Sequence, residues 1–307
     1  MPNGDIVATI FNQPCHGKWE GDVECWASED GGCLWDHRGT PAPHEPCTNR
    51  MNVAAGLAGD GALIVLSSGW SDKPVADKVK DNPFRSEILA PWICRSADGG
   101  ATWERTGEIH IEQQDPAIPF GDVVAGADGA LHATACAESN TWFLTSRDDG
   151  YTWGEAVPLA ADGGHNETDI FHVGGGRWLA ASRTAHEGRL ELFVSEDDGK
   201  TWDFRKALTG PAMHPAHLTR LQDGRILLSF GIRFGNCRGV GVRFSEDEGD
   251  SWSGISVIVS LEGAGDNGYP SSVQRDDGTV VTAWYASASS MHARYHMGVT
   301  HWQPDEF

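Results

Sequence analysis

Short apolar runs separated by turn residues recur along most of the chain. Five segments each contain an apolar stretch, a turn with DG or GG, and a second apolar stretch: residues 51–70, 121–136, 169–183, 217–231 and 271–285. This pattern predicts two antiparallel strands joined by a tight hairpin. A further short strand follows some hairpins, as in LELFVS (190–195) and GVGVRFS (239–245). No helical periodicity competes with these strands, so the pattern predicts an all-β fold.

An eight-residue string, S-x-D-x-G-x-T-W, marks the end of each repeat. It occurs, with some degeneracy, at 28–35, 96–103, 146–153, 195–202 and 245–252, and successive copies start 68, 50, 49 and 50 residues apart. A period near 50 fits the four-stranded blade of a propeller. The Ser and Asp side chains can bond backbone N–H groups, and the Trp can pack between strands. We therefore interpret these acids as turn-forming, because a calcium loop would need a distal Glu that is absent.

The repeats predict where the blades lie. Five blades are centred on residues 50–103, 120–153, 167–202, 217–252 and 269–302, and residues 3–35 make a partial sixth. The innermost strand of the N-terminal blade and the outer strand of the C-terminal blade have no evident sequence. We expect one domain over residues 1–307, a six-bladed β-propeller of four-stranded antiparallel blades with an incomplete first blade. An open blade edge favours pairing with another chain, so a homo-oligomer is a further expectation.

The net charge limits the expected binding partners, and the cysteine content indicates the redox compartment. The 307-residue chain has 44 acidic and 23 basic residues, a formal net charge of −21. Such a field repels nucleic acid and anionic membranes, so neither is an expected partner. The cysteine count, seven, is odd and shows no zinc spacing, which favours buried free thiols in a reducing compartment. With no signal peptide or membrane-spanning run visible, we expect a cytoplasmic protein. Because the net charge is negative, an anionic substrate would require a local cluster of arginines.

The repeated string is the Asp box, and the chain resembles the sialidase, or neuraminidase, superfamily of six-bladed β-propellers with BNR repeats. The resemblance covers essentially the whole sequence. It implies an exo-glycosidase that hydrolyses a terminal acidic sugar, sialic or a related ulosonic acid, with retention and without metal or other cofactor. In that family three arginines clamp the substrate carboxylate, an Asp serves as acid and base, and a Tyr attacks the anomeric carbon with a Glu as its base.

The resemblance assigns these roles to residues of this chain. Arg50 opens the strand TNRMNVAAGL, with Arg-Met-Asn where the family has Arg-Ile-Pro, and Asp72 follows in SGWSDKP as the acid and base. Glu167 stands at a strand start, and Arg183 ends the same hairpin. Tyr269, in GYPSS, matches the family's Tyr-Ser string and is the expected nucleophile.

The third arginine is left open among neighbouring candidates. Arg238 opens the strand before the last Asp box, with Arg233 and Arg243 as rivals. Strand alternation favours Arg238, because Arg243 lies beside the Asp box at the structural end. The extended loop after Asp72 is a further place for function.

Polar and aromatic residues near the other strand starts complete the expected sugar-binding set, namely Asn52, Trp70, Asp122, His165 and His217. Two other functions stay open. The propeller could bind an acidic carbohydrate without cleaving it, or it could be a polysaccharide lyase or hydrolase acting on glycans that contain uronic acid. The exact sugar is not determined by these patterns.

Overall fold

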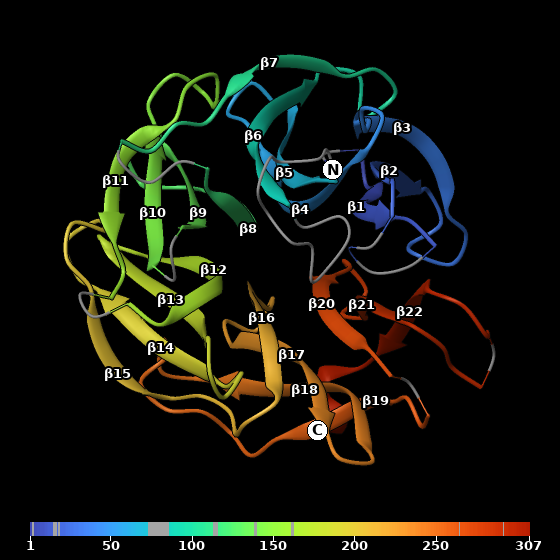
Figure 1. Cartoon of the computed structure of the whole chain (residues 1–307). Helices are drawn as coiled ribbons and strands as arrows, with labels where there is room; N and C mark the ends of the chain where they lie inside the picture. The colour runs from blue at the N-terminus through green and yellow to red at the C-terminus, as the bar shows by residue number, and fades with distance from the viewer. Residues whose placement is uncertain are drawn as a thin grey trace. The chain divides into compact units, whose positions relative to one another are not determined.

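The chain folds almost entirely into β-strands, as the hydrophobic pattern predicts. The computed structural model describes residues 1, 3–14, 17, 19–72, 86–112, 116–137, 140–160, 163–263, 265–290 and 292–307. In this part of the chain the regular elements are strands, apart from a 3₁₀ turn at Pro304–Glu306 (Figure 1). No helix there is long and apolar enough to cross a membrane. The strands form two compact units, Met1–Pro158 and Leu159–Phe307, which are described separately.

The first unit contains two antiparallel systems. A three-stranded sheet is formed by β1 (Ile6–Asn12), β2 (Asp22–Ser28) and β3 (Asp36–Ala42). An eight-stranded sheet follows, built from β4 (Thr48–Leu57), β5 (Leu63–Ser71), β6 (Glu87–Ser96), β7 (Glu104–Glu108), β8 (Ile118–Ala125), β9 (Leu131–Ala137), β10 (Asn140–Ser146) and β11 (Gly154–Pro158). It consists of two four-stranded meanders whose inner strands, β4 and β8, pair in parallel.

The second unit contains three successive meanders. The first comprises β12 (His165–Gly174), β13 (Arg177–Thr184), β14 (Leu190–Ser195) and β15 (Asp203–Ala207). The next comprises β16 (Met213–Arg220), β17 (Ile226–Phe234), β18 (Cys237–Ser245) and β19 (Ser256–Ser260). The last has three strands, β20 (Asn267–Gln274), β21 (Val280–Ala286) and β22 (His296–Trp302). The first and last sheets thus have three strands each in the described residues, at the two places where the sequence pattern lacks a strand.

Apolar side chains between neighbouring sheets form the core. In the second unit, Leu179 and Leu192 of one meander pack with Leu228 and Phe230 of the next, and all four are almost fully buried. Burying such a side chain stabilises a fold by roughly 1.5–3 kcal/mol. The second strands β5, β9 and β17 are buried at most positions, and in the β12–β15 meander the third strand, β14, is buried throughout.

Each Asp box closes a turn through its own side chains. Ser195 Oγ donates to Asp197 Oδ1 at 2.9 Å and accepts from the Gly199 N–H at 2.9 Å. The Thr201 N–H donates to the same carboxylate at 2.9 Å, and Trp202 Nε1 donates to the Gly199 carbonyl at 3.1 Å. The other four copies repeat the Ser–Asp, Gly–Ser and Trp–Gly bonds. The acids of the motif are therefore turn-forming, as the sequence predicts.

The cysteines in the described part of the chain are free, and they differ in exposure. Cys25 and Cys94 are buried, whereas Cys33, Cys47 and Cys237 are exposed. Burial raises the pKa of Cys25 to about 11 and that of Cys94 to about 12, so both are neutral thiols near pH 7. The expectation of buried free thiols therefore holds for these two and not for the three exposed ones.

Candidate functional site

Bulges near the starts of the inner strands direct polar side chains to one end of the second unit. The pairing register of β12, β16 and β20 with the following strand shifts close to the start of each strand. Glu167, His214 and Tyr269 lie in these three bulges. A bulge re-aims the side chain that it carries and often lies beside an active site. This end of the strands is opposite to the end that carries the Asp boxes, because each box follows the third strand of its meander.

Tyr269, Glu167 and Arg183 form a connected polar group. The Tyr269 hydroxyl donates a hydrogen bond to Glu167 Oε1. Arg183 Nη1 donates to the other carboxylate oxygen, Glu167 Oε2, at 2.6 Å. The Glu167 and Arg183 side chains are 19% and 25% exposed, so the pair is partly shielded from water yet reachable from solvent. Glu167 is thereby held as an oriented acceptor for the phenolic proton.

Tyr269 is a neutral phenol in this arrangement. Burial raises its pKa well above the usual value of a tyrosine, and the negative charge of Glu167 raises it further, whereas Arg233 and Arg183 act in the opposite direction. Its backbone has a φ of 48°, in the left-handed region. Such a conformation costs a bulky residue about 1–3 kcal/mol, and residues held this way concentrate at functional sites.

Arg233, rather than Arg238, lies against the tyrosine. Its guanidinium carbon is 5.3 Å from the centroid of the Tyr269 ring. Arg238 instead donates from Nη1 to the carbonyl of Gly265 at 3.0 Å, and Arg243 donates to carbonyls that include that of Ser253. Arg233 and Arg238 are directly paired across β17 and β18. Since cross-strand partners share a face, alternation could not separate these two candidates.

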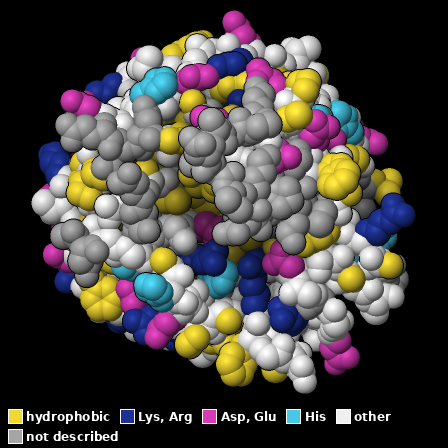
Figure 2. All heavy atoms as spheres, viewed as in Figure 1, with side chains coloured by type: hydrophobic (Ala, Val, Ile, Leu, Met, Phe, Trp, Pro, Cys, Tyr) yellow, Lys and Arg dark blue, Asp and Glu magenta, His cyan; other side chains and the backbone are white. Residues whose placement is uncertain are grey.

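His214 lies near both arginines and was not among the residues selected from sequence. Its side chain is almost completely buried. Burial lowers its pKa to about 3, with further contributions from the positive charges of Arg183 and Arg233. Its Nδ1 has no hydrogen-bond partner within the described residues. Figure 2 shows basic and histidine side chains next to one another over the region of β12 and β16.

The two histidines that sequence did select are bound within the fold. His165 Nε2 lies 2.9 Å from Glu191 Oε2, and its Nδ1 lies 3.1 Å from the carbonyl of Gly163. His217 Nδ1 accepts from the Ser272 N–H at 3.3 Å. Both imidazoles connect neighbouring strands or loops, and their contact with substrate stays a prediction.

In the first unit, Arg50 is deeply packed. Its guanidinium carbon lies 3.5 Å from the ring centroid of Trp92, and Nη1 donates to the carbonyl of Ala90 at 3.0 Å. Only 4% of the residue is exposed. Burial lowers its pKa to about 10, and the nearby charge of Arg105 adds to this, so Arg50 remains a cation near neutral pH. Its predicted contact with a substrate carboxylate stays a prediction.

The remaining candidates of the first unit lie along β4, β5 and β8. Asp72 directly follows β5, is half-buried, and donates from its backbone N–H to the Cys47 carbonyl at 2.8 Å. Asn52 Nδ2 lies 3.4 Å from Ser68 Oγ. Trp70 is the penultimate residue of β5, and Asp122 pairs with Ala55 of β4 in the parallel ladder. The extended loop expected to carry function, residues 73–85, lies outside the described residues.

His214, which belongs to a polar cluster at a strand start, and Tyr285 were given no role from the sequence, although both carry a readable signal. His214-Pro215 and Tyr269-Pro270 are both X-Pro pairs at a strand start, and proline within a sheet is typical of bulges and strand ends. Tyr285 follows Tyr269 by 16 residues, and Arg183 follows Glu167 by the same 16 residues. Tyr285 therefore has the same place in its hairpin as Arg183 has in the earlier one. Aligning the hairpins with one another, in addition to the Asp boxes, would have identified both positions.

Comparison with known proteins places the chain in a family. The sequence profile of the BNR repeat-like domain family matches residues 4–282, so the chain belongs to that family. Its fold is that of the sialidase-like β-propellers, as the Asp boxes indicated.

Solved structures of similar fold include a protein of unknown function from Dyadobacter fermentans, with a TM-score of 0.82 and 24% identity over 97% of this chain and 91% of the other. The Hadza microbial sialidase Hz136 has a TM-score of 0.75 and 18% identity, covering 99% of this chain and 64% of the other. The NanB sialidase of Streptococcus pneumoniae has a TM-score of 0.73 and 12% identity, covering 99% and 67%. The chain thus spans about two thirds of the length of these two sialidases. At these identities the likeness shows the fold.

Proposed function

We propose that the protein is a sialidase-like glycoside hydrolase that removes a terminal acidic sugar, sialic or a related ulosonic acid, with retention. The observation that carries this proposal is the hydrogen bond from Tyr269 to Glu167, whose second oxygen is held by Arg183. A phenol bonded to an oriented carboxylate is a nucleophile with its base in place. Tyrosine in this role is characteristic of sialidases and distinguishes them from glycosidases that use two carboxylates.

The chemistry follows from the protonation states. Glu167 takes the phenolic proton while the Tyr269 oxygen bonds to the anomeric carbon, and the leaving oxygen takes a proton from a general acid. The resemblance to sialidases gives that role to Asp72. Water, losing a proton to the same acid–base group, then attacks the anomeric carbon, the bond to Tyr269 breaks, and Glu167 returns the proton to the tyrosine. Two displacements at one carbon retain its configuration.

The charge of the substrate explains the choice of nucleophile. An acidic sugar is repelled by a carboxylate nucleophile and by a protein of net charge −21, whereas a neutral phenol carries no such penalty. Arg183 and Arg233 supply positive charge beside Tyr269, which meets the requirement set by the overall charge. The strands form six successive meanders along the chain, which supports six blades, and the first and last of them have three strands in the described residues.

Activity toward aryl glycosides tests the proposal. We expect release of the aryl alcohol from a sialic or other ulosonic acid glycoside, and no release from uronic or neutral glycosides. Tyr269→Phe and Glu167→Gln should each lower kcat/KM at least about a thousandfold, because they remove members of one catalytic unit. Tyr151→Phe, the same change on the exposed surface of the first unit, is the matched control.

Two outcomes would contradict the proposal. If a full panel of acidic aryl glycosides is not turned over but acidic sugars bind equally to wild type and to Tyr269→Phe, the protein is a binding propeller. If unsaturated products that absorb in the near ultraviolet appear from uronic-acid glycans, it is a lyase.

A further inference from the structure

Arg233 is held by the protein at every one of its nitrogens. Nε donates to the Asn267 carbonyl at 2.7 Å, Nη2 donates to the Tyr285 hydroxyl at 3.3 Å, and Nη1 lies 3.4 Å from Asp266 Oδ1. Two of its N–H groups therefore donate hydrogen bonds to the protein, and the third nitrogen is ion-paired. The side chain is only 17% exposed. These partners fix the guanidinium in one place.

The groups around Arg233 belong to the sheet that carries Tyr269. Asp266 directly precedes β20, and Tyr285 lies near the end of β21. Hydrogen bonding to Asp266 is one cause of the raised pKa of Tyr285, after burial. The rings of Tyr269 and Tyr285 lie 5.5 Å apart, and Tyr285 stacks in turn on Tyr295 at 6.1 Å. The guanidinium from β17 is therefore bracketed by fixed groups of the neighbouring sheet.

A fixed cation beside Tyr269 has a chemical consequence. The groups that face this phenol are Glu167 on β12, Arg183 on β13, Arg233 on β17 and Tyr285 on β21, with the neutral His214 of β16 near both arginines. Arg183 is already paired with Glu167. Arg233 lies 5.3 Å from the centroid of the Tyr269 ring, and of the two arginines it does more to lower the pKa of this phenol. A preorganised charge stabilises a developing anion without the cost of reorganisation.

We propose that Asp266 and Tyr285 are positioning residues that hold Arg233 against Tyr269, so that this arginine stabilises the tyrosine's anion in addition to any contact that it makes with the substrate. The catalytic meaning of this arrangement rests on the proposed function. The effect on the ionisation of residue 269 does not, and it can be measured in the protein without substrate.

The experiment places 3,5-difluorotyrosine at position 269 alone, which makes the phenol more acidic at nearly unchanged size and gives one fluorine NMR signal. The pH titration of that signal is recorded in the otherwise unchanged protein and in Arg233→Met, Tyr285→Phe and Asp266→Asn. Removing the arginine should raise the pKa of residue 269 by about 1–3, the usual effect of one nearby opposite charge. Tyr285→Phe, which changes no charge, should raise it in the same direction, and Tyr151→Phe should leave it unchanged.

Asp266→Asn separates positioning from simple electrostatics by its sign. Losing a negative charge near a phenol lowers its pKa if nothing moves, whereas releasing Arg233 raises it. An increase in both Tyr285→Phe and Asp266→Asn supports the proposal. No change or a decrease in either, in a variant whose thermal unfolding shows that it is folded, overturns it. Failure of hydrolysis in the wild type would refute the proposed function and leave this titration result standing on its own.

Discussion

Single side chains at the inner strand starts set the chemistry of the second unit. Glu167 and Tyr269 act through direct hydrogen bonding, and His214 acts through its neutrality, because a protonated imidazole beside Arg183 and Arg233 would add a third positive charge. The three lie in equivalent bulges of neighbouring meanders. One local backbone device thus places three different functional groups at the same end of the strands.

His214 makes stability depend on pH. Its pKa is about 3 in the folded chain and about 6.5 when exposed, so the unfolded state binds the extra proton and the fold loses stability as pH falls below about 6.5. Between pH 7 and 4.5 the loss from this one group is on the order of 2–3 kcal/mol. Urea unfolding at both pH values should therefore show a smaller loss in His214→Gln than in wild type.

Equal pH dependence in the two proteins would mean that His214 protonates freely in the folded state. His110→Gln, the same substitution at an exposed histidine of the first unit, is the control and should leave the difference between the two pH values as in wild type.

At the scale of elements, the Asp box does the repetitive structural work. In all five copies the residue before the glycine that the boxes share has a φ in the left-handed region. In chain order these residues are Gly31, Gly99, Asp149, Asp198 and Glu248. The bonds from Ser and Thr side chains and from backbone N–H groups outweigh the strain at the three positions that are not glycine. The same bonds lower the pKa of the aspartate at the third position of each box, to about 2 for Asp98 and Asp247.

The lowered pKa values predict how the boxes respond to acid. A carboxyl whose pKa is depressed on folding stabilises the fold above its unfolded value, near 3.9, and this stabilisation disappears as pH falls through about 2. Asp247→Asn should lower the melting temperature at pH 6, because its amide cannot accept from the Ser251 hydroxyl as the carboxylate does. The difference from wild type should shrink as pH falls from about 4 toward 2.

Asp276→Asn changes the same charge at an exposed position outside the boxes and serves as the matched control. A melting-temperature deficit of Asp247→Asn that persists unchanged down to pH 2 would contradict the assignment of the effect to the ionised carboxylate.

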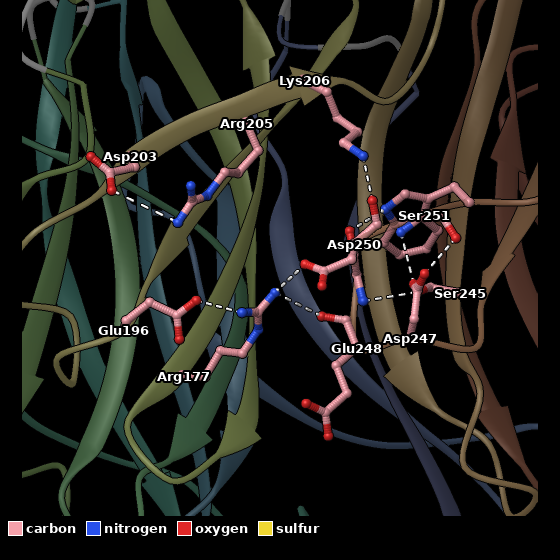
Figure 3. Close-up of polar contacts among 12 residues, drawn as sticks. Arg177, Glu196, Asp203, Arg205, Lys206, Ser245, Asp247, Glu248, Asp250 and Ser251 are labelled. Carbon is pink, nitrogen blue, oxygen red and sulfur yellow. Dashed lines mark hydrogen bonds and ion pairs between the residues drawn. The ribbon is translucent and has the colours of Figure 1, made fainter.

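At the scale of the whole molecule, three arginines tie one meander to the Asp box of the following meander within a unit. Arg177 donates to Glu196 of its own sheet, to Asp250 at 2.7 Å and to the carbonyl of Glu248 at 3.4 Å, as Figure 3 shows. In the first unit, Arg38 and Arg95 donate to the carbonyls of Gly99 and Asp149. All three accepting carbonyls belong to the fourth residue of a box, which is the residue with a left-handed φ. The turn of the box therefore directs a backbone carbonyl toward an arginine of the preceding meander.

This connection predicts unequal costs for two arginine substitutions in the first unit. Arg95 is buried, stacks on Tyr151 and bonds both Asp60 and Asp149, so Arg95→Met should lower the free energy of unfolding by roughly 2–3 kcal/mol. Arg147 has a 60% exposed side chain with ion pairs to Asp128 and Glu155, so Arg147→Met should cost about 0–1 kcal/mol. Urea unfolding of both variants measures the difference, and equal costs would show that the inter-sheet bonds contribute nothing beyond surface charge.

The sequence by itself determined the strand-and-turn architecture and the structural role of the Asp boxes, and it predicted that the first and the last sheet each lack a strand, as they do in the described residues. These follow from local patterns that repeat five times, since each copy of a turn or hairpin signal reinforces the others. The resemblance to sialidases named Tyr269, Glu167 and Arg183, but only the tertiary structure showed that Glu167 bonds both of the others. Only the tertiary structure placed Arg233 rather than Arg238 against the Tyr269 ring, buried Arg50 against Trp92, and brought His214, Asp266 and Tyr285 to Tyr269 and its arginines. Those outcomes depend on bulges, which change the direction of a side chain, and on packing between sheets, which decides its neighbours. The two-residue alternation of a strand predicts neither a bulge nor the neighbours in the next sheet.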